Sequence, residues 1–414
     1  MYLTADWPWP PTSGGRLQAT HLADAMRVEH DVTVLAADRE DDRFPAWSGA
    51  VRAIRARRSS PARRAVDAAR ALAAGRQVLL QRMLSAGGPA ALSEVLDAMR
   101  PDLVVLGRPY FDGFVDVAAE RRLPLMIEAN EDLLRASRSI ARHGATLRAR
   151  LVATVDSLVV GRMQRRNYAR ADQLLVCSPI EADILAATSH PKRVSVVPNV
   201  VPAVPAAPQP DEIKAIAFLG AYGYAPNEAA AIELIEEILP RVAALGGPNA
   251  AVLIGRDPTR RMRRSADAHP AARLTGEVPD VVAELSAAGV LVVPVRSGAG
   301  TRVKILEAAA AGIPTVSTPF GAEGLDLRDE IELLIASTPD EIAVAVMRLH
   351  ADPDLRRRLG AAARSAVAER YSIEAGRRAV GAAMAPLLAA PDETDAAASA
   401  SRLAGEPPAG ASST

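Results

Sequence analysis

The stretch that decides the fold is Gly298-Ala-Gly-Thr-Arg-Val-Lys-Ile-Leu-Glu307, which continues as Ala-Ala-Ala-Ala-Gly312-Ile-Pro314. An aliphatic run at 290–295 leads into its glycines, and a helical pattern follows them. Gly312 and Pro314 end that pattern, and a β-branched run begins directly afterwards. The order strand, glycine loop, helix, strand is typical of a Rossmann-like unit, in which N–H groups at the helix start receive an anion.

The side chains of this stretch suit a ligand that carries phosphate groups and hydroxyls. Gly298 and Gly300 let an anion approach the backbone, and Arg302 and Lys304 add positive charge. Glu307 follows farther along the helix, where a carboxylate suits sugar hydroxyls. The alternative is a plain turn between strand and helix, with Lys304 and Glu307 paired on a solvated face.

The scarcity of lysine favours the functional interpretation. Only three of the 49 basic residues are lysines, namely Lys192, Lys214 and Lys304. Nearly every basic residue of the chain is arginine. A lysine directly after the glycine loop therefore indicates that a compact ammonium group is needed there.

Composition limits the class of protein. A chain of 414 residues with 49% hydrophobic residues suits two domains, each with its own core. Residues 1–210 carry 28 Lys and Arg against 22 Asp and Glu, a net charge of +6 within a chain of zero net charge. A nucleic-acid-binding protein would show a strongly basic domain, so we expect no nucleic-acid partner.

Cysteine usage and hydropathy point to the cytoplasm. The single cysteine, Cys177, excludes a disulfide framework and fits a reducing compartment. No apolar run has the length of a membrane-spanning helix, and no secretory signal opens the chain. We therefore expect a cytoplasmic protein, with peripheral contact to the inner face of a membrane as an option.

Aliphatic runs alternate with helical patterns over most of the chain, which predicts α/β domains with parallel sheets. Strands are expected at 2–4, 32–36, 103–106, 125–128, 173–177, 194–197, 213–219, 251–254, 272–274, 290–295, 315–317 and 332–335. Helices are expected at 16–26, 89–99, 226–245, 281–287, 301–311, 339–350, 354–370 and 373–388.

The domain boundaries follow from a proline-rich segment. Residues 201–210 contain too many prolines for a helix or a central strand, and predict a linker. We expect a Rossmann-like domain, a linker, a second Rossmann-like domain, a last helix and a disordered tail, over 1–200, 201–212, 213–372, 373–390 and 391–414. The two sheets should face a central cleft, where ligands bind in open α/β folds.

Several segments together resemble glycosyltransferase family 4. They are the stretches at 298–308, 311–318 and 321–325, with Pro-Pro-Thr-Ser-Gly-Gly-Arg at 10–16, Phe-Leu-Gly-Ala-Tyr-Gly-Tyr-Ala-Pro-Asn at 218–227, Thr-Gly-Glu-Val-Pro-Asp at 275–280 and Arg-Tyr-Ser at 370–372. The similarity covers most of residues 10–388. It implies a GT-B fold and transfer of a sugar, of hexosyltransferase type, from a nucleotide-diphosphate sugar. It also implies retention of configuration, no bound metal and no other cofactor, and a last helix that crosses back to the first domain.

The resemblance also implies roles for individual residues. Arg302 and Lys304, with the amides near Gly300 and Thr301, would bind the diphosphate as the catalytic cations. Further donor-site positions are the ribose-binding Glu307, Gly298 in the loop, Gly220 in the cleft, Val278 beside the base, and Gly14 and Gly15 over the phosphates from the first domain.

Two departures from the family pattern concern the same site. Ala299 replaces a glutamate eight residues before Glu307, and the segment 221–227 lacks the usual basic pair. We find no metal-ligand spacing of His, Asp or Glu, and no metal site is expected.

The acceptor side carries weaker signals. Glu128, Asn130 and Asp132 follow the predicted strand at 125–127, where hydroxyls of a glycan, lipid or small-molecule acceptor would lie. Nine arginines occur in each of the segments 51–82 and 135–170, with one aspartate in each. Such basic segments favour an anionic membrane or a lipid-phosphate acceptor, and the alternative is a solvated face.

Two other functions remain open from the sequence. A nucleotide-sugar epimerase would use the same fold, but it would need acidic and histidine side chains around the sugar. An inactive partner protein that binds a sugar nucleotide is the second, and Ala299 and the missing basic pair at 221–227 are its main support.

Overall fold

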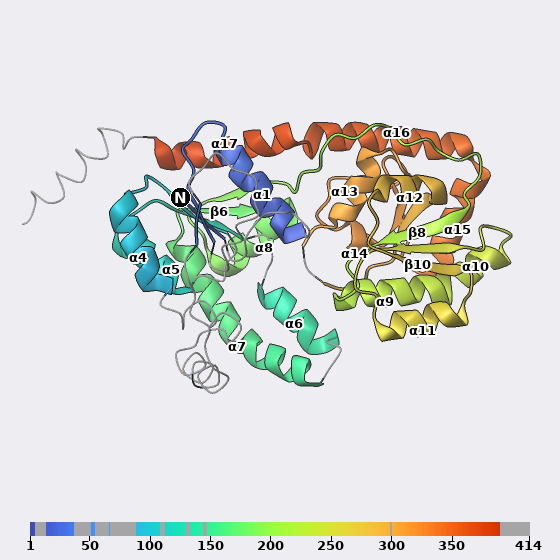
Figure 1. Ribbon diagram of the computed structural model, residues 1–414, viewed down its shortest axis with the longest axis horizontal. Helices are drawn as coiled ribbons and strands as arrows, with labels where there is room; N and C mark the ends of the chain where they lie inside the picture. The colour runs from blue at the N-terminus through green and yellow to red at the C-terminus, as the bar shows by residue number, and fades with distance from the viewer. Residues whose placement is uncertain are drawn as a thin grey trace, which may run out of the picture.

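The computed structural model describes residues 1–4, 14–36, 51–53, 66, 88–107, 112–129, 133–143, 147–298 and 300–389. Within these residues the chain forms two parallel sheets, each covered by helices on both faces (Figure 1). The α/β prediction is confirmed. The predicted tail at 391–414, most of the Arg-rich segment 51–82, and the predicted acceptor residues Asn130 and Asp132 lie outside the described residues.

The first sheet contains seven described strands in the order β3-β2-β1-β4-β5-β6-β7, and every neighbouring pair is parallel. The strands are β1 (Tyr2–Thr4), β2 (Val34–Ala36), β3 (Val51–Ala53), β4 (Val104–Gly107), β5 (Leu125–Glu128), β6 (Gln173–Val176) and β7 (Val194–Val196). Most are short and aliphatic because a parallel sheet with helices on both faces buries both sides of its strands.

Helices pack on both faces of this sheet. The helices of this domain are α1 (Gly14–Met26), α4 (Gly88–Met99), α5 (Asp112–Glu120), α6 (Leu133–His143), α7 (Leu147–Arg170) and α8 (Pro179–Ser189), of which α6 packs on α7. One face carries Tyr2, Val105 and Met126 and packs against α1 and the last helix. The other face carries Leu3 and Ile127 and packs against α4, α5, α7 and α8.

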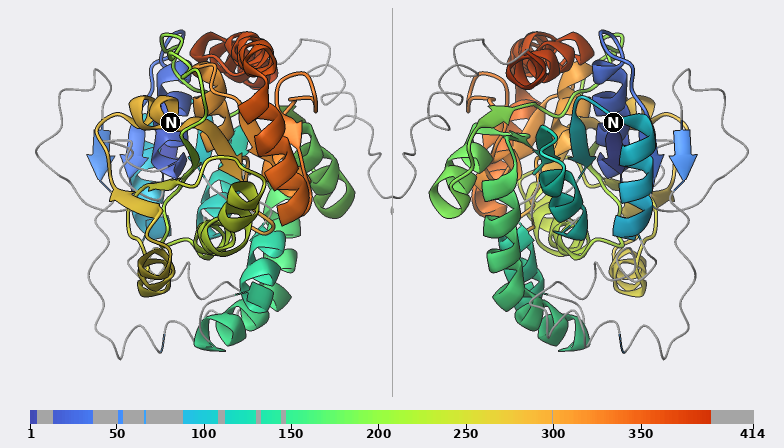
Figure 2. Two further views of the ribbon diagram at one scale, coloured as in Figure 1. Left: turned by 90° about the vertical axis from the view of Figure 1, so that its right-hand side faces the viewer. Right: turned by 90° about the vertical axis from the view of Figure 1, so that its left-hand side faces the viewer.

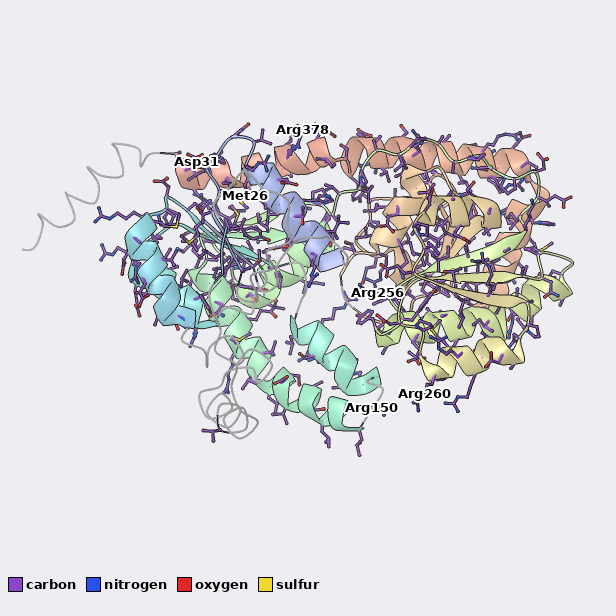
Figure 3. All side chains as sticks on the ribbon, viewed as in Figure 1. Met26, Asp31, Arg150, Arg256, Arg260 and Arg378 are labelled. Atoms are coloured by element: carbon purple, nitrogen blue, oxygen red, sulfur yellow. The ribbon has the colours of Figure 1, made fainter. Side chains whose placement is uncertain are left out.

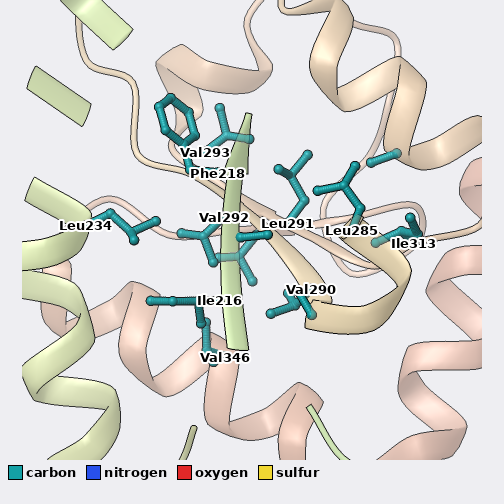
Figure 4. Close-up of a cluster of buried hydrophobic side chains, with 14 of the residues drawn as sticks. Ile216, Phe218, Leu234, Leu285, Val290, Leu291, Val292, Val293, Ile313 and Val346 are labelled. Carbon is teal, nitrogen blue, oxygen red and sulfur yellow. The ribbon is translucent and has the colours of Figure 1, made fainter. Parts of the chain in front are cut away.

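The second sheet contains six described strands in the order β10-β9-β8-β11-β12-β13, again all parallel. They are β8 (Ala215–Leu219), β9 (Ala251–Ile254), β10 (Ala272–Gly276), β11 (Gly289–Val293), β12 (Thr315–Ser317) and β13 (Leu334–Ile335). Figure 4 shows the centre of its core, where Val290 to Val293 of β11 lie among buried aliphatic side chains from both faces.

The helices of the second domain are α9 (Ala225–Glu233), η2 (Leu234–Ile238), α10 (Leu239–Ala244), α11 (Arg260–Ala268), α12 (Val281–Ala288), α13 (Val303–Ala310), α14 (Pro319–Ala322), α15 (Pro339–Ala351), α16 (Pro353–Arg370) and α17 (Ile373–Leu388). The helix predicted at 226–245 is interrupted by the π-turn η2, directly before Pro240. Proline has no N–H to donate to the preceding turn, which explains a local change of helical hydrogen bonding there.

The chain crosses between the sheets twice, and the two crossings contact each other. The N–H of Val201 donates to the carbonyl of Tyr371, at 2.9 Å. Residues 202–212 then run along the second domain, where the buried Arg356 donates to the carbonyls of Pro210 and Asp211. After Tyr371, helix α17 packs against α1 of the first domain, so α16 and α17 follow one edge of the whole molecule (Figure 1).

None of the helices among the described residues is long and apolar enough to span a bilayer. A cytoplasmic location stays a prediction.

Replacing Gly255 with alanine is expected to lower the free energy of unfolding by roughly 2–4 kcal/mol. Gly255 follows β9 with φ of +139°, and a Cβ there would lie 1.8 Å from the carbonyl oxygen of Gly220. Urea denaturation measures the change. Gly246→Ala is the matched control, because Gly246 also has positive φ (+82°) but no atom near its Cβ position. Equal losses in the two variants would contradict the steric argument.

Candidate functional site

The stretch 289–317 folds as predicted into strand, glycine loop, helix and strand. Gly298 and Gly300 have φ of +119° and +77°, values that favour glycine. A Cβ on Gly298 would also lie 2.7 Å from the hydroxyl of Tyr224. The loop therefore depends on glycine for both its turn and its close contact with the segment before α9.

Two backbone N–H groups at the start of α13 have no acceptor among the described residues. Among the described residues, the N–H groups of Arg302 and Lys304 donate to no acceptor, whereas the N–H of Thr301 bonds to the thiol of Cys177. The N-cap position, Arg302, provides no side-chain cap. Free N–H groups at the positive end of a helix dipole form a site for an anion.

Lys304 holds its ammonium inside the protein without a counter-ion. Its Nζ donates to Oδ1 of Asn227 at 2.9 Å and lies 4.2 Å from the ring centroid of Phe218. No carboxylate among the described residues forms an ion pair with it. Burial, together with repulsion from Arg302, lowers the pKa of Lys304 to about 7, although Glu307 acts in the opposite direction.

Arg302 is held beside Lys304 by an aromatic ring. Its guanidinium donates to the carbonyl of Gly300, and its Cζ lies 4.6 Å from the ring centroid of Phe320. Nη2 is buried and has no hydrogen-bond partner among the described residues. Burial lowers the pKa of Arg302 below its ordinary value. An unsatisfied buried donor and an unpaired ammonium both favour an anionic ligand.

A further cation reaches the same ring from the first domain. Arg135 of α6 lies 5.4 Å from the ring centroid of Phe320 and pairs with Glu323 at 2.7 Å. Its charge also acts on Arg302. The cations near the candidate phosphate site thus come from both domains, whereas the sequence analysis predicted cations from the second domain alone.

Glu307 lies on α13 between buried neighbours. Burial raises the pKa of its carboxyl, and Lys304 opposes this. Neither oxygen has a hydrogen-bond partner among the described residues. A partly buried carboxylate without donors is suited to accept hydrogen bonds from hydroxyl groups of a ligand.

Gly220 controls the position of Asn227. It follows β8, and a Cβ on it would lie 3.0 Å from Cγ of Asn227. The Asn227 amide donates to the carbonyl of Ala221, and its oxygen accepts from Lys304. Glycine at position 220 therefore leaves space for the side chain that orients Lys304.

The remaining predicted donor residues lie on neighbouring elements. Val278 is in the loop after β10, partly buried against the second core. Gly14 and Gly15 are the first two residues of α1, so the helix begins two residues earlier than expected. The roles of Val278, Gly14 and Gly15 in the donor site stay predictions.

The glycine loop also contacts the first domain. Asn199 donates to the hydroxyl of Thr301, and the Thr301 hydroxyl lies 3.8 Å from Sγ of Cys177. Cys177 in turn donates to Glu181, and burial raises its thiol pKa well above the ordinary value. Cys177 therefore lies beside the glycine loop as an uncharged thiol.

Glu128 ends β5 and is buried, with Oε2 accepting from the hydroxyl of Tyr2 at 3.0 Å. It borders a largely apolar pocket between the two domains. The pocket is lined by α1, the segment 197–200, the start of α17, and Val303 of α13. Glu128 and the glycine-loop helix thus line one pocket, while an acceptor role for Glu128 stays a prediction.

Three side chains at this site were not found from the sequence: Asn227, Phe320 and Arg135. Each belongs to another element and reaches Arg302 or Lys304 only through the tertiary fold. No group of three or more His, Cys, Asp or Glu side chains that could hold a metal occurs in the described part of the chain.

Two family descriptions match the sequence. "Glycosyl transferase 4-like domain" matches residues 13–200, and "Glycosyl transferases group 1" matches residues 213–352. No curated protein matches the chain as a relative.

Solved structures share the architecture at low identity. Sucrose-phosphate synthase from Thermosynechococcus elongatus has a TM-score of 0.70 and 17% identity, over 94% of this chain and 99% of its own. A glycosyltransferase from Rickettsia africae has a TM-score of 0.64 and 10% identity, over 94% and 98%. Anabaena HepE, solved in complex with UDP, has a TM-score of 0.65 and 11% identity, over 93% and 99%.

The two family matches cover both Rossmann-like domains, and the solved structures confirm the predicted GT-B fold. The chain therefore belongs to glycosyltransferase family 4.

Proposed function

We propose that this glycosyltransferase moves a sugar from a nucleoside-diphosphate sugar to a hydroxyl group of an acceptor. The observation that supports it most is Lys304, a half-buried ammonium with no carboxylate ion-pair partner among the described residues. The free N–H groups at the start of α13 and the unsatisfied Nη2 of Arg302 lie in the same ten-residue stretch. Anabaena HepE has been solved with UDP and with UDP-glucose, which supports a nucleotide-sugar donor.

The proposed chemistry relies on stabilising the leaving group. When the bond from the anomeric carbon to the phosphate oxygen breaks, negative charge develops on the diphosphate. Lys304, Arg302 and the helix N–H groups would stabilise that charge without a divalent metal. The acceptor oxygen forms the new bond to the anomeric carbon, and its proton passes to an oxygen of the departing phosphate. That proton path suits the retention of configuration that the family resemblance implies.

The acceptor would bind on the first-domain side of α13. Glu128 and Val303 line the same pocket, which places a polar residue of the first domain near the glycine-loop helix. The pocket walls from α1 and α17 are mainly aliphatic, for example Leu17, Leu22 and Val380. An acceptor with an apolar part next to its hydroxyl would suit these walls.

A thermal-shift screen of UDP-, GDP-, ADP- and dTDP-sugars tests the proposal. A ligand present at one hundred times its dissociation constant stabilises a protein by about 2.7 kcal/mol, so a donor should raise the melting temperature clearly. The stabilising sugar nucleotide is then incubated with the protein and the products are analysed. Release of nucleoside diphosphate, with the sugar bonded to water or to an added acceptor alcohol, supports transfer, whereas an isomerised sugar nucleotide would indicate an epimerase and contradict the proposal.

Nucleotide binding is expected to take up a proton at pH 8. In the empty enzyme the pKa of Lys304 is about 7, so most molecules carry a neutral amine at pH 8. A bound diphosphate favours the charged form and raises that pKa, which takes up close to one proton for each site. Isothermal titration calorimetry in buffers of different ionisation enthalpy measures this number.

Lys304→Met is the control, and nucleotide binding to this variant should take up no proton at pH 8. A pH of 8 is chosen because free nucleoside diphosphates are then already fully ionised. A binding enthalpy that does not depend on the buffer at pH 8 would refute the assignment.

A further inference from the structure

Helices α6 and α7 form a hairpin that projects from the first domain. Figure 2 shows them below the body of the molecule in both side views. The inner face of α7 is held by Leu134 of α6, which packs against Val160 and Met163. The outer face of α7 is left to solvent.

That outer face carries an apolar stripe. Leu147, Leu151 and Leu158 are 74%, 60% and 73% exposed, and Val155 beside them is 44% exposed. Their spacing of four, four and three residues places them on one side of the helix, over about 17 Å of its length. We name these four residues the α7 stripe. A row of exposed leucines is unfavourable in water and marks a contact surface.

Arginines without acidic partners surround the α7 stripe. Arg138 and Arg142 of α6 and Arg162 and Arg165 of α7 are exposed. None of the four pairs with a carboxylate among the described residues. The only acidic residue between 135 and 170 is Asp156, which is buried. The hairpin therefore presents leucines within a field of uncompensated positive charge.

A second group of arginines lies along the same edge of the molecule. Helix α11 of the second domain exposes Arg260, Arg261, Arg263 and Arg264, and none of them has an ion-pair partner among the residues described. Figure 3 shows Arg260 of α11 and Arg150 of α7 on the lower edge, whereas Arg378 of α17 lies on the upper edge. Both domains thus contribute positive charge to one side.

We infer that this edge docks on an anionic lipid bilayer, with the α7 stripe inserted at the level of the headgroups. An amphipathic helix with leucines on one side and arginines beside them binds in this way, and the two contributions add. A second copy of the chain is disfavoured, because the approach of two such hairpins brings like charges together. The inference goes beyond the proposed function and does not depend on it.

Docking would also position the active site. Arg135 on α6 pairs with Glu323, which follows α14 beside the glycine loop. A hairpin held at a bilayer would therefore hold the interdomain site at a fixed position relative to the membrane surface.

Vesicle flotation with the full-length protein tests the inference. We expect the protein to float at low salt with vesicles that contain phosphatidylcholine and phosphatidylglycerol in equal parts. With vesicles of phosphatidylcholine alone, the protein should remain in the bottom fraction. The triple variant Leu147→Ser, Leu151→Ser and Leu158→Ser should bind at least about tenfold more weakly. These side chains are exposed, so its melting temperature should match that of the wild type.

A charge variant and two matched controls complete the test. Replacing Arg138, Arg142, Arg162 and Arg165 with glutamine should weaken binding by about fivefold for each arginine. The controls are Leu245→Ser with Val344→Ser, exposed apolar residues of the second domain, and Arg378→Gln on the opposite edge with Arg358→Gln at an exposed arginine of α16. Both controls should bind like the wild type.

Three results would overturn the inference. The first is no flotation of the wild type with anionic vesicles at low salt. The second is full binding by the triple serine variant, which would indicate adsorption by charge alone. The third is a wild-type dimer in sedimentation velocity that the triple variant loses, which would assign the α7 stripe to a second copy.

Discussion

Replacing Lys304 with methionine is expected to lower kcat by at least about a hundredfold, the usual cost of removing one preorganised group that stabilises transition-state charge. The same change should leave the empty protein at least as stable as the wild type at pH 7. Lys304 is a buried cation with one hydrogen bond, to Asn227, and methionine fills a similar volume without charge. A large loss of activity without a loss of stability separates a catalytic cation from a structural one.

The sign of the stability effect follows from the pKa. Burial lowers the pKa of Lys304 from 10.5 to about 7. Between these values the unfolded chain binds the proton and the folded enzyme does not, so the stability of the wild type rises with pH across this window. Lys304→Met should remove that contribution to the pH dependence.

Lys214→Met is the matched control, because Lys214 is an exposed lysine of the same domain. It should keep wild-type kcat and stability. Turnover is measured as nucleoside-diphosphate release from the donor found in the thermal-shift screen. Near-normal kcat in Lys304→Met would contradict the assignment, and unfolding of that variant at ordinary temperature would make Lys304 a structural residue.

Replacing Glu307 with glutamine is expected to weaken nucleotide binding by roughly tenfold to a hundredfold, as for the loss of hydrogen bonds to a charged group. The Glu307 carboxylate has no hydrogen-bond donor among the described residues, so glutamine breaks no hydrogen bond within the protein, and the attraction to Lys304 that it removes is offset by the burial of the charged carboxylate. The loss should therefore appear in affinity and leave the melting temperature of the unliganded protein unchanged.

The ribose assignment of Glu307 has its own test. The wild type should bind a ribonucleotide more tightly than its 2′-deoxy counterpart, and Glu307→Gln should reduce this preference. Glu369→Gln, at an exposed glutamate of α16, is the control and should keep the preference. If the variant discriminates between the two nucleotides as well as the wild type does, Glu307 binds another part of the ligand.

The sheet could be predicted largely from sequence because most strands are continuous aliphatic runs. The helical periodicity in 298–312 and the glycines at its ends likewise depend on residues that are neighbours in the sequence, so they can be recognised from the sequence alone. β3 (Val51–Ala53) was missed, because the residues Val-Arg-Ala occur in an Arg-rich segment and carry no aliphatic run. The π-turn in the helix predicted at 226–245 was also missed, although Pro240 was a signal for it.

The part of the site that is formed by residues close together in the sequence could be predicted. Arg302, Lys304 and Glu307 lie within six positions on one loop and helix, so their proximity follows from the helix itself. The partners that set their chemistry come from elsewhere: Asn227 from α9 and Arg135 from α6. No periodicity in the sequence shows that the hydrogen-bond partner of Lys304 is the neutral amide of Asn227.

The most direct test of the central claim compares a nucleoside diphosphate with its monophosphate by calorimetry at pH 7, using the wild type and Lys304→Met. The claim is that Lys304, Arg302 and the N-terminus of α13 form the site for the diphosphate. The wild type should bind the diphosphate at least about tenfold more tightly, since one added charge-assisted contact is worth about 1.5 kcal/mol or more, and Lys304→Met should lose most of that preference. Equal affinity of the wild type for both nucleotides, or an unchanged preference in Lys304→Met, would contradict the account.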